Sequence, residues 1–236
     1  MSFLWTVALE ADAPGLERGD PPEGLLSAEE HDKLATLKFE QRRRKWLLGR
    51  FAAKRVLRVL LASERGAAPA PDEITIANDP EGAPFAILPG GELCPFCLSI
   101  SHRAGVALAV VAREPGVRLG ADLETVAPRD PALVADFFTP LEQELVARAA
   151  AGDARDRLVA RIWSAKESVL KALGVGLRLD TRSIEIAGEG GAPWPGAPEG
   201  FHALDVRRAP NDARVVALTR DEGHFVHTVA RLEPRP

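Results

Sequence analysis

The 236-residue sequence contains only two cysteines, too few for a disulfide framework, so a reducing cytoplasm is the expected compartment. It has no run of about 18 apolar residues, and we expect no segment that spans a membrane. The first residues, MSFLWTVALEAD, lack a basic stretch, a long apolar core and a small-residue cleavage site, which argues against a signal peptide. A chain of this length can bury one large core or two small ones.

Acidic residues are missing from one stretch, QRRRKWLLGRFAAKRVLRVL (residues 41–60), which carries eight basic residues. The rest of the chain has 22 basic and 34 acidic residues, a net charge of −12 against −4 for the whole. A cationic element in an anionic protein favours a local anionic ligand over a nucleic-acid surface, so no nucleic-acid partner is expected. A solvated basic helix face explains the same stretch equally well.

Capping signals mark two helical regions. SAEE at residues 27–30 is a capping box, and helical apolar spacing continues from it to Leu60 with a break expected near Phe39. TPLE at residues 139–142 is a second capping box with proline at the first helical position. A further helix over about residues 154–173 is expected to stop at Gly174.

Short β-branched segments separated by glycine, proline and aspartate follow each helical region and predict strands. The order of elements therefore repeats, although we find no repeat at the level of residues. The prediction is an α+β fold of two similar halves, residues 1–116 and 117–236. Each half packs helices on a small antiparallel sheet, and a pseudo-two-fold relates the halves.

GADLETV (residues 120–126) places two carboxylates on one face of a strand, because Asp122 and Glu124 are two positions apart. Carboxylates at that spacing can converge on a hard cation, and magnesium takes one or two of them together with water and substrate phosphate. Two solvated acids on a half-exposed strand are the simpler explanation of this segment alone.

Two other short segments carry candidate chemistry. Ser101 and His102, in LSISHRAG, lie where a strand ends and can donate hydrogen bonds to a phosphate. Neighbouring residues on a strand face opposite ways, which disfavours a nucleophile–base pair, and an ordinary strand end is also possible. Cys94 and Cys97 form CPFC, but no second pair completes a zinc site, and we expect both to be structural.

WSAKESVLKALG (residues 163–174) predicts a helix with unusual charges. Trp163 and Glu167 share one side, and Glu167 with Lys171 forms an i,i+4 pair. A core tryptophan with a surface salt bridge is one explanation of this helix. The other places Glu167 and Lys171 on a cleft, with Lys166 flanking it.

The order GRFAAKRVL, SISHRAG, GADLETVAPR, FFTPLEQELV and WSAKESVLKALG resembles the 4′-phosphopantetheinyl transferases of the Sfp type. That family carries a G-[VI]-D-[IL]-E segment and, some 40 residues later, W-x-x-K-E-[SA]-x-x-K-x-x-G. The resemblance spans about residues 49–176, and Ala121 stands in the usual aliphatic position of the first segment. The length is similar to the long, pseudo-dimeric class rather than the half-length class that trimerises, which implies a monomer.

The resemblance implies roles for these residues in an active site between the halves. Asp122, Glu124 and Glu167 would be magnesium ligands, with Glu167 also the general base. Lys171 would contact the pyrophosphate of coenzyme A, and Lys166 would have a similar charge role. Arg50, Ser101 and His102 would bind the nucleotide end of coenzyme A.

One departure concerns the G-K-P that often precedes the Ser-His strand in this family. Ala83 replaces the lysine here, and Arg103 is a possible substitute.

The implied activity is transfer of phosphopantetheine from coenzyme A to a serine of an acyl or peptidyl carrier protein, releasing 3′,5′-ADP. Docking of that carrier on the basic helix of residues 42–58 is an expectation. A module that only binds coenzyme A or a carrier, and a magnesium-dependent nucleotide phosphohydrolase, are the alternatives.

Overall fold

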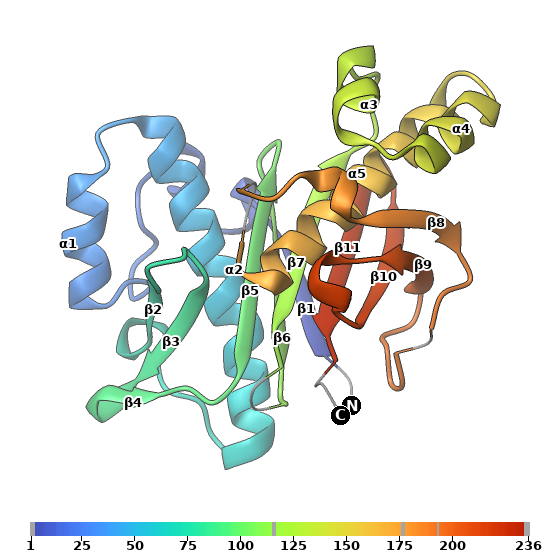
Figure 1. Cartoon of the computed structure of the whole chain (residues 1–236). Coiled ribbons are helices and arrows are strands. Elements are labelled where there is room, and N and C mark those ends of the chain that lie inside the picture. Colours follow the sequence, from blue (N-terminus) through green and yellow to red (C-terminus); the bar gives the residue numbers. More distant parts are fainter. Residues whose placement is uncertain (1–2, 115–116, 176–177, 193, 234–236) are drawn as a thin grey trace. The chain divides into compact units, whose positions relative to one another are not determined.

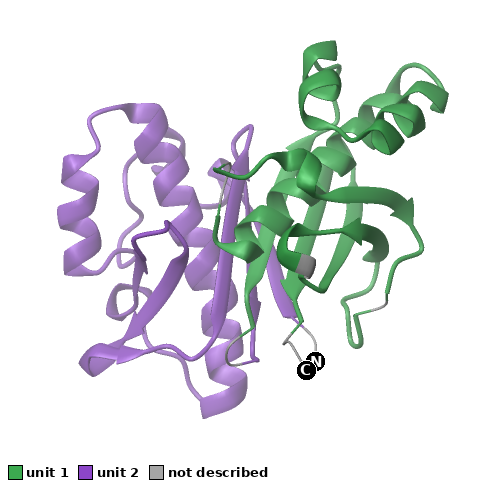
Figure 2. Cartoon of the chain, viewed as in Figure 1, with its two compact units in different colours: residues 1–2, 116–236 green, residues 3–115 purple. Residues whose placement is uncertain are grey.

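The computed structural model describes residues 3–114, 117–175, 178–192 and 194–233 (Figure 1). The chain separates into two compact units, residues 3–115 and residues 1–2 with 116–236 (Figure 2). We call them the N-terminal unit and the C-terminal unit and describe each by itself. The predicted boundary after Gly116 lies outside the described residues, as does Gly176 at the end of the family-like region.

The N-terminal unit packs a long helix on a three-stranded antiparallel sheet of order β1-β6-β5, beside a second sheet of order β2-β3-β4. Its strands are β1 (Phe3–Leu9), β2 (Thr75–Asn78), β3 (Pro84–Leu88), β4 (Glu92–Leu93), β5 (Cys97–Arg103) and β6 (Val106–Ala112), and its helices are α1 (Ala28–Thr36) and α2 (Glu40–Arg65). The apolar face of α2, including Leu47, Leu57 and Leu61, is buried in one core with Ala109 and Val111 of β6.

The C-terminal unit has one antiparallel sheet of order β7-β11-β10-β9-β8, with α5 packed against β7, β11 and β10. Its elements are β7 (Leu119–Thr125), α3 (Pro131–Phe137), α4 (Pro140–Arg148), α5 (Asp153–Leu173), β8 (Glu185–Glu189), β9 (His202–Arg208), β10 (Val215–Glu222) and β11 (Phe225–Leu232). Figure 1 shows α5 running across this sheet. The predicted α+β fold with two similar halves is confirmed.

The helix boundaries follow the capping signals. Ser27 and Thr139 each accept a hydrogen bond from the backbone three residues on, and the glutamate there bonds back. Phe39 lies between α1 and α2, as expected. Helix α5 ends at Gly174, whose φ of 71° is in the left-handed region that glycine tolerates.

Among the described residues, we find no helix that combines the length and the apolar character needed to cross a membrane.

Three residues of the N-terminal unit have counterparts in the C-terminal unit at one fixed spacing, which the sequence analysis missed. Ser27 and Thr139, Glu30 and Glu142, and Lys54 and Lys166 are three pairs, each separated by 112 positions. The partners occupy the same places: the N-cap of the helix that precedes the long helix (α1 or α4), its third residue, and a buried position on the long helix. The statement that only element order repeats is therefore wrong.

Helix α5 approaches β7 so closely at one point that only glycine fits there. A Cβ atom added to Gly120 would lie 1.9 Å from the backbone oxygen of Ser168 and 2.6 Å from the backbone nitrogen of Ala172. Neither atom can move without the helix, so a side chain at this position forces the two elements apart. This contact sets how far α5 lies from the strand that carries Asp122 and Glu124.

We expect Gly120→Ala to destabilise the C-terminal unit by about 1–3 kcal/mol or more, as overpacking of a core does. Urea unfolding followed by circular dichroism measures the loss. Gly66→Ala is the control, because it meets no atom within 4 Å and strains only a φ of +77°. An equal or larger loss in Gly66→Ala would show that the helix can shift at Gly120 without consequence.

Candidate active site

Asp122 is bonded to a lysine of helix α5. The Lys171 Nζ atom donates to Asp122 Oδ1 over 2.7 Å and to the Ala121 backbone oxygen over 2.9 Å. The Asp122 side chain is 8% exposed and that of Lys171 is 32% exposed. Lys171 thus makes a contact from helix to strand, which its i,i+4 spacing to Glu167 did not indicate.

Glu124 is bonded to an arginine that the sequence analysis did not single out. Arg129 lies after the end of β7 and donates from one terminal nitrogen to Glu124 Oε2 and, over 3.0 Å, to the Thr125 backbone oxygen. The Glu124 side chain is 10% exposed and that of Arg129 is 19% exposed. The sequence signal that could have indicated this contact was a basic residue five positions after the second carboxylate.

Glu167 carries a buried oxygen, Oε1, with no hydrogen-bond partner among the described residues. Burial raises the pKa of Glu167 above its usual range, the negative charge of Asp122 raises it further, Lys171 opposes this, and Glu124 adds to it. The structure therefore brings Glu167 within electrostatic reach of both strand carboxylates. We call Asp122, Glu124 and Glu167 the acidic triplet.

The acidic triplet is not arranged as a ready-made metal site. In the part of the chain that the structure describes, no group of three His, Cys, Asp or Glu side chains is placed to hold an ion. Two of the three carboxylates instead have a cation of the protein beside them. The site is a cluster of three acidic side chains whose charge is partly balanced by Lys171 and Arg129.

Lys166 does not flank this site, and its expected charge role is wrong. Its side chain is fully buried, and Nζ lies 2.8 Å from Glu142 Oε2, 2.9 Å from the Thr181 oxygen and 2.7 Å from the Ile184 oxygen. An ammonium group has three protons, so these contacts satisfy it completely. Lys166 and Lys171 are five positions apart and lie on different sides of α5.

Glu142 links three elements around Lys166. It bonds the Thr139 backbone nitrogen at the start of α4, and its Oε1 accepts from the Ile186 nitrogen of β8 over 2.8 Å. The sequence identified Glu142 only as a helix cap, because the buried lysine and the strand come from distant segments.

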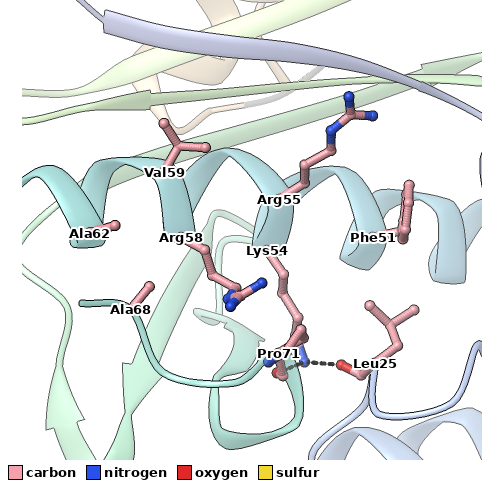
Figure 3. A pocket seen from close by; sticks show the side chains of 9 residues that line it. All are labelled: Leu25, Phe51, Lys54, Arg55, Arg58, Val59, Ala62, Ala68 and Pro71. Atoms are coloured by element: carbon pink, nitrogen blue, oxygen red, sulfur yellow. Dashed lines mark hydrogen bonds between the residues drawn. The ribbon is translucent and has the colours of Figure 1, made fainter.

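The N-terminal unit contains the same arrangement. Lys54 is 1% exposed and is bonded to Glu30, and it donates to the backbone oxygens of Leu25 and Pro71 over 2.7 Å and 2.9 Å (Figure 3). Glu30 also accepts from the Ile76 nitrogen over 3.0 Å. A cavity of about 500 Å³ opens beside this group along α2, and none of the predicted site residues lines it.

His102 and Ser101, two of the residues predicted to bind the nucleotide, are neighbours on strand β5 of the N-terminal unit. A Cβ atom at Gly49 would be 2.6 Å from His102 Nε2, so the imidazole lies directly against helix α2. His102 is exposed, whereas Ser101, its neighbour on β5, is buried and faces the other side of the strand. This geometry is unlike a serine–histidine nucleophile pair.

The Arg50 side chain is held by contacts within the N-terminal unit. It is 7% exposed, donates to Asn78 Oδ1 over 3.1 Å, and has its guanidinium 4.7 Å from the centre of the Trp46 ring. Asn78 in turn donates to the Gly82 oxygen over 2.8 Å. Asn78 therefore connects Arg50 to the loop that carries Ala83, a link that the sequence did not indicate.

Most side chains of the basic stretch make contacts within the N-terminal unit. Six of its eight basic side chains contact acids or backbone oxygens: Arg43 with Gly19, Arg44 with Glu10, Arg50 and Lys54 with Glu30, Arg55 with Asp12, and Arg58 with Pro69. The other two, Arg42 and Lys45, are exposed. Glu10, Glu30 and Asp12 balance three of the eight positive charges, and docking of a carrier on α2 stays a prediction.

Cys94 and Cys97 are both reduced and half-buried, and burial raises the pKa of each thiol.

Comparison with known proteins finds similarity to one family. The sequence model of the 4′-phosphopantetheinyl transferase superfamily matches residues 118–222. The chain is 29% identical over 193 residues to the 4′-phosphopantetheinyl transferase HetI of Nostoc sp., covering 78% of this chain and 73% of HetI. Both matches relate the chain to 4′-phosphopantetheinyl transferases, and the family model covers just under half of its residues.

Solved structures of holo-[acyl-carrier-protein] synthases also match. The Neisseria meningitidis protein has 21% identity and a TM-score of 0.38, over 49% of this chain and 97% of its own. The Mycobacterium tuberculosis protein has 25% identity and a TM-score of 0.34, over 51% of this chain and 100% of its own.

The two lysines of α5 are expected to differ in their effect on stability. Lys166→Met leaves Glu142 buried without its counter-charge and should lower the free energy of unfolding by about 3–5 kcal/mol. Lys171→Met breaks a pair that is partly exposed and should lower it by only about 1 kcal/mol. Urea unfolding measures both, and adding Glu142→Gln to Lys166→Met should recover part of the loss. Equal losses in the two single variants would contradict the structural role of Lys166.

The raised pKa of Glu167 predicts a dependence of stability on pH. The folded protein holds this proton more tightly than the unfolded chain, so stability is lost as pH rises through the folded-state pKa. Without metal at pH 8, Glu167→Gln should therefore raise Tm above that of the wild type. The gain should vanish below about pH 4. Glu144→Gln, on the exposed side of α4, is the control and should show no such pH-dependent gain.

Proposed function

We propose that this chain transfers the 4′-phosphopantetheine group of coenzyme A to a serine hydroxyl of an acyl or peptidyl carrier protein, with magnesium, and releases 3′,5′-ADP. The observation that carries the proposal is the placement of the acidic triplet and Lys171 on one strand and one helix. Both elements lie within the part of the chain that matches the superfamily.

The residues fit a hard divalent cation by their chemistry. All three members of the acidic triplet offer carboxylate oxygens, and magnesium prefers oxygen ligands with substrate phosphate and water completing its shell. The unpartnered oxygen of Glu167 and the raised pKa of that group indicate excess negative charge that a cation would relieve. Asp122, Glu124 and Glu167 would hold the ion. When bound, magnesium would neutralise charge on the diphosphate of coenzyme A.

The side chains of the protein would perform the rest of the reaction. The serine oxygen forms a bond to the phosphorus that bears pantetheine, and the bond from that phosphorus to the oxygen of 3′,5′-ADP breaks. The serine proton must be accepted, and Glu167 is the base we assign to this step. Lys171, whose ammonium is partly exposed, would stabilise the charge that develops on the leaving phosphate.

The N-terminal unit would bind the nucleotide end of coenzyme A. His102 is exposed beside α2, and with Ser101 and Arg50 it forms the proposed set for the adenine nucleotide and its 3′-phosphate. Arg50 acts in this proposal by fixing the loop around Ala83 through Asn78. The metal carboxylates would come from the C-terminal unit. The chain would act as a monomer in the cytoplasm.

The direct test is incubation with coenzyme A, magnesium and an apo carrier protein, followed by mass spectrometry of the carrier. A gain of about 340 Da on the carrier is the expected result. Hydrolysis of coenzyme A without an acceptor would indicate a phosphohydrolase instead, and binding of coenzyme A or carrier with no turnover would indicate a binding module.

Asp122→Asn and Glu167→Gln are expected to lower kcat by about 10²–10⁴-fold, because one weakens the metal site and the other also removes the base. Asp153→Asn, an exposed acid on the first turn of α5, is the matched control and should keep wild-type turnover. Rates are measured with saturating magnesium, and circular dichroism checks the fold. Near-wild-type turnover in either site variant would remove that residue from the assignment.

A further inference from the structure

Both strand carboxylates of the acidic triplet are held by cations of the C-terminal unit. Lys171 bonds Asp122, and Arg129 bonds Glu124. With Glu167 ionised, these five side chains carry a net charge of −1, and with Glu167 protonated they are neutral. The site thus supplies its own counter-ions.

A divalent cation cannot simply be added to this arrangement. Its charge would be repelled by the two resident cations, and one carboxylate oxygen of Asp122 and one of Glu124 already accept charge-assisted hydrogen bonds from them. The metal can use the other oxygen of each carboxylate only against the charge of Lys171 and Arg129, so its binding is strengthened when these cations move away. An anionic ligand that accepts them makes that movement favourable.

We propose that Arg129 is a movable counter-ion, which neutralises Glu124 in the metal-free protein and transfers to the diphosphate of the donor when the metal binds. The proposal rests on the proposed function for its metal and its donor. The guanidinium presents several donors in a planar fork, which suits a carboxylate and a phosphate equally well.

The position of Arg129 fits this role better than a purely structural one. It lies between the end of β7 and the start of α3, outside both elements, and its side chain is 19% exposed at the edge of the site. Its other contacts are to Thr125, through the backbone oxygen at 3.0 Å and the hydroxyl at 3.5 Å. By contrast, the fully buried Lys166 has all its protons committed to fixed acceptors.

Transfer of Arg129 from Glu124 to the diphosphate makes the metal and the donor bind cooperatively. Metal binding releases Arg129 for the diphosphate, and diphosphate binding removes Arg129 from Glu124. By linkage, each ligand must raise the affinity of the other by the same factor. The free protein should accordingly bind a divalent cation weakly.

Binding of Mn²⁺, a paramagnetic replacement for magnesium, tests the proposal when followed by electron paramagnetic resonance with and without coenzyme A. Arg129→Gln should bind Mn²⁺ alone about tenfold more tightly than the wild type, a change of about 1.4 kcal/mol. It should also lose most of the tightening that coenzyme A produces. Arg129→Lys keeps the charge and should behave nearly as the wild type. Arg148→Gln, which removes an exposed pair on α4, is the matched control and should change nothing.

The outcomes separate this inference from the proposed function. If Asp122→Asn abolishes Mn²⁺ binding but Arg129→Gln binds no more tightly than the wild type, the metal site stands and the counter-ion role is overturned. If the wild type does not bind Mn²⁺ even with coenzyme A, both are overturned. Thermal melting without metal checks that each variant folds. If Arg129→Gln fails to fold, Mn²⁺ binding to Arg129→Ala, measured with and without coenzyme A, decides the question.

Discussion

A lysine ammonium buried against a capping-box glutamate holds each unit of this protein together. In the C-terminal unit Glu142 joins the start of α4, the lysine of α5 and the backbone of β8, and Lys166 binds two further backbone oxygens. Removing either charge would leave the other buried without a partner, which is far less favourable than the intact pair. The helix that carries Glu167 and Lys171 is therefore fixed at its buried side by a contact that uses neither of them.

The same contact in the N-terminal unit shows what the two units share and what they do not. Lys54 and Glu30 reproduce the pair, but the positions that match Glu167 and Lys171, again 112 residues earlier, are Arg55 and Val59. The buried lysine–glutamate pair that supports the long helix occurs in both units. The glutamate and lysine of the acidic site occur on α5 only. Gly120 adds the second constraint, because it allows α5 to lie near enough to β7 for Lys171 to reach Asp122.

Local signals predicted the parts of the structure that depend on neighbouring residues. The capping boxes, the break at Phe39 and the end of α5 at Gly174 each follow from a few adjacent side chains. The roles of Lys166 and Lys171 could not be separated in this way, since both belong to one motif. Which lysine is buried depends on Glu142 and on backbone oxygens from distant segments. The roles of Arg129 and Asn78 were missed for the same reason. Each role depends on the residue that the side chain contacts, and neither residue belongs to a motif.

The cavity beside α2 lies where the matching surfaces of the two long helices differ. Arg55 and Val59 line it, and they occupy the places of Glu167 and Lys171 on the other long helix (Figure 3). The two helix surfaces therefore differ in charge and in the ligands they can accept, although the same buried lysine lies beside each of them.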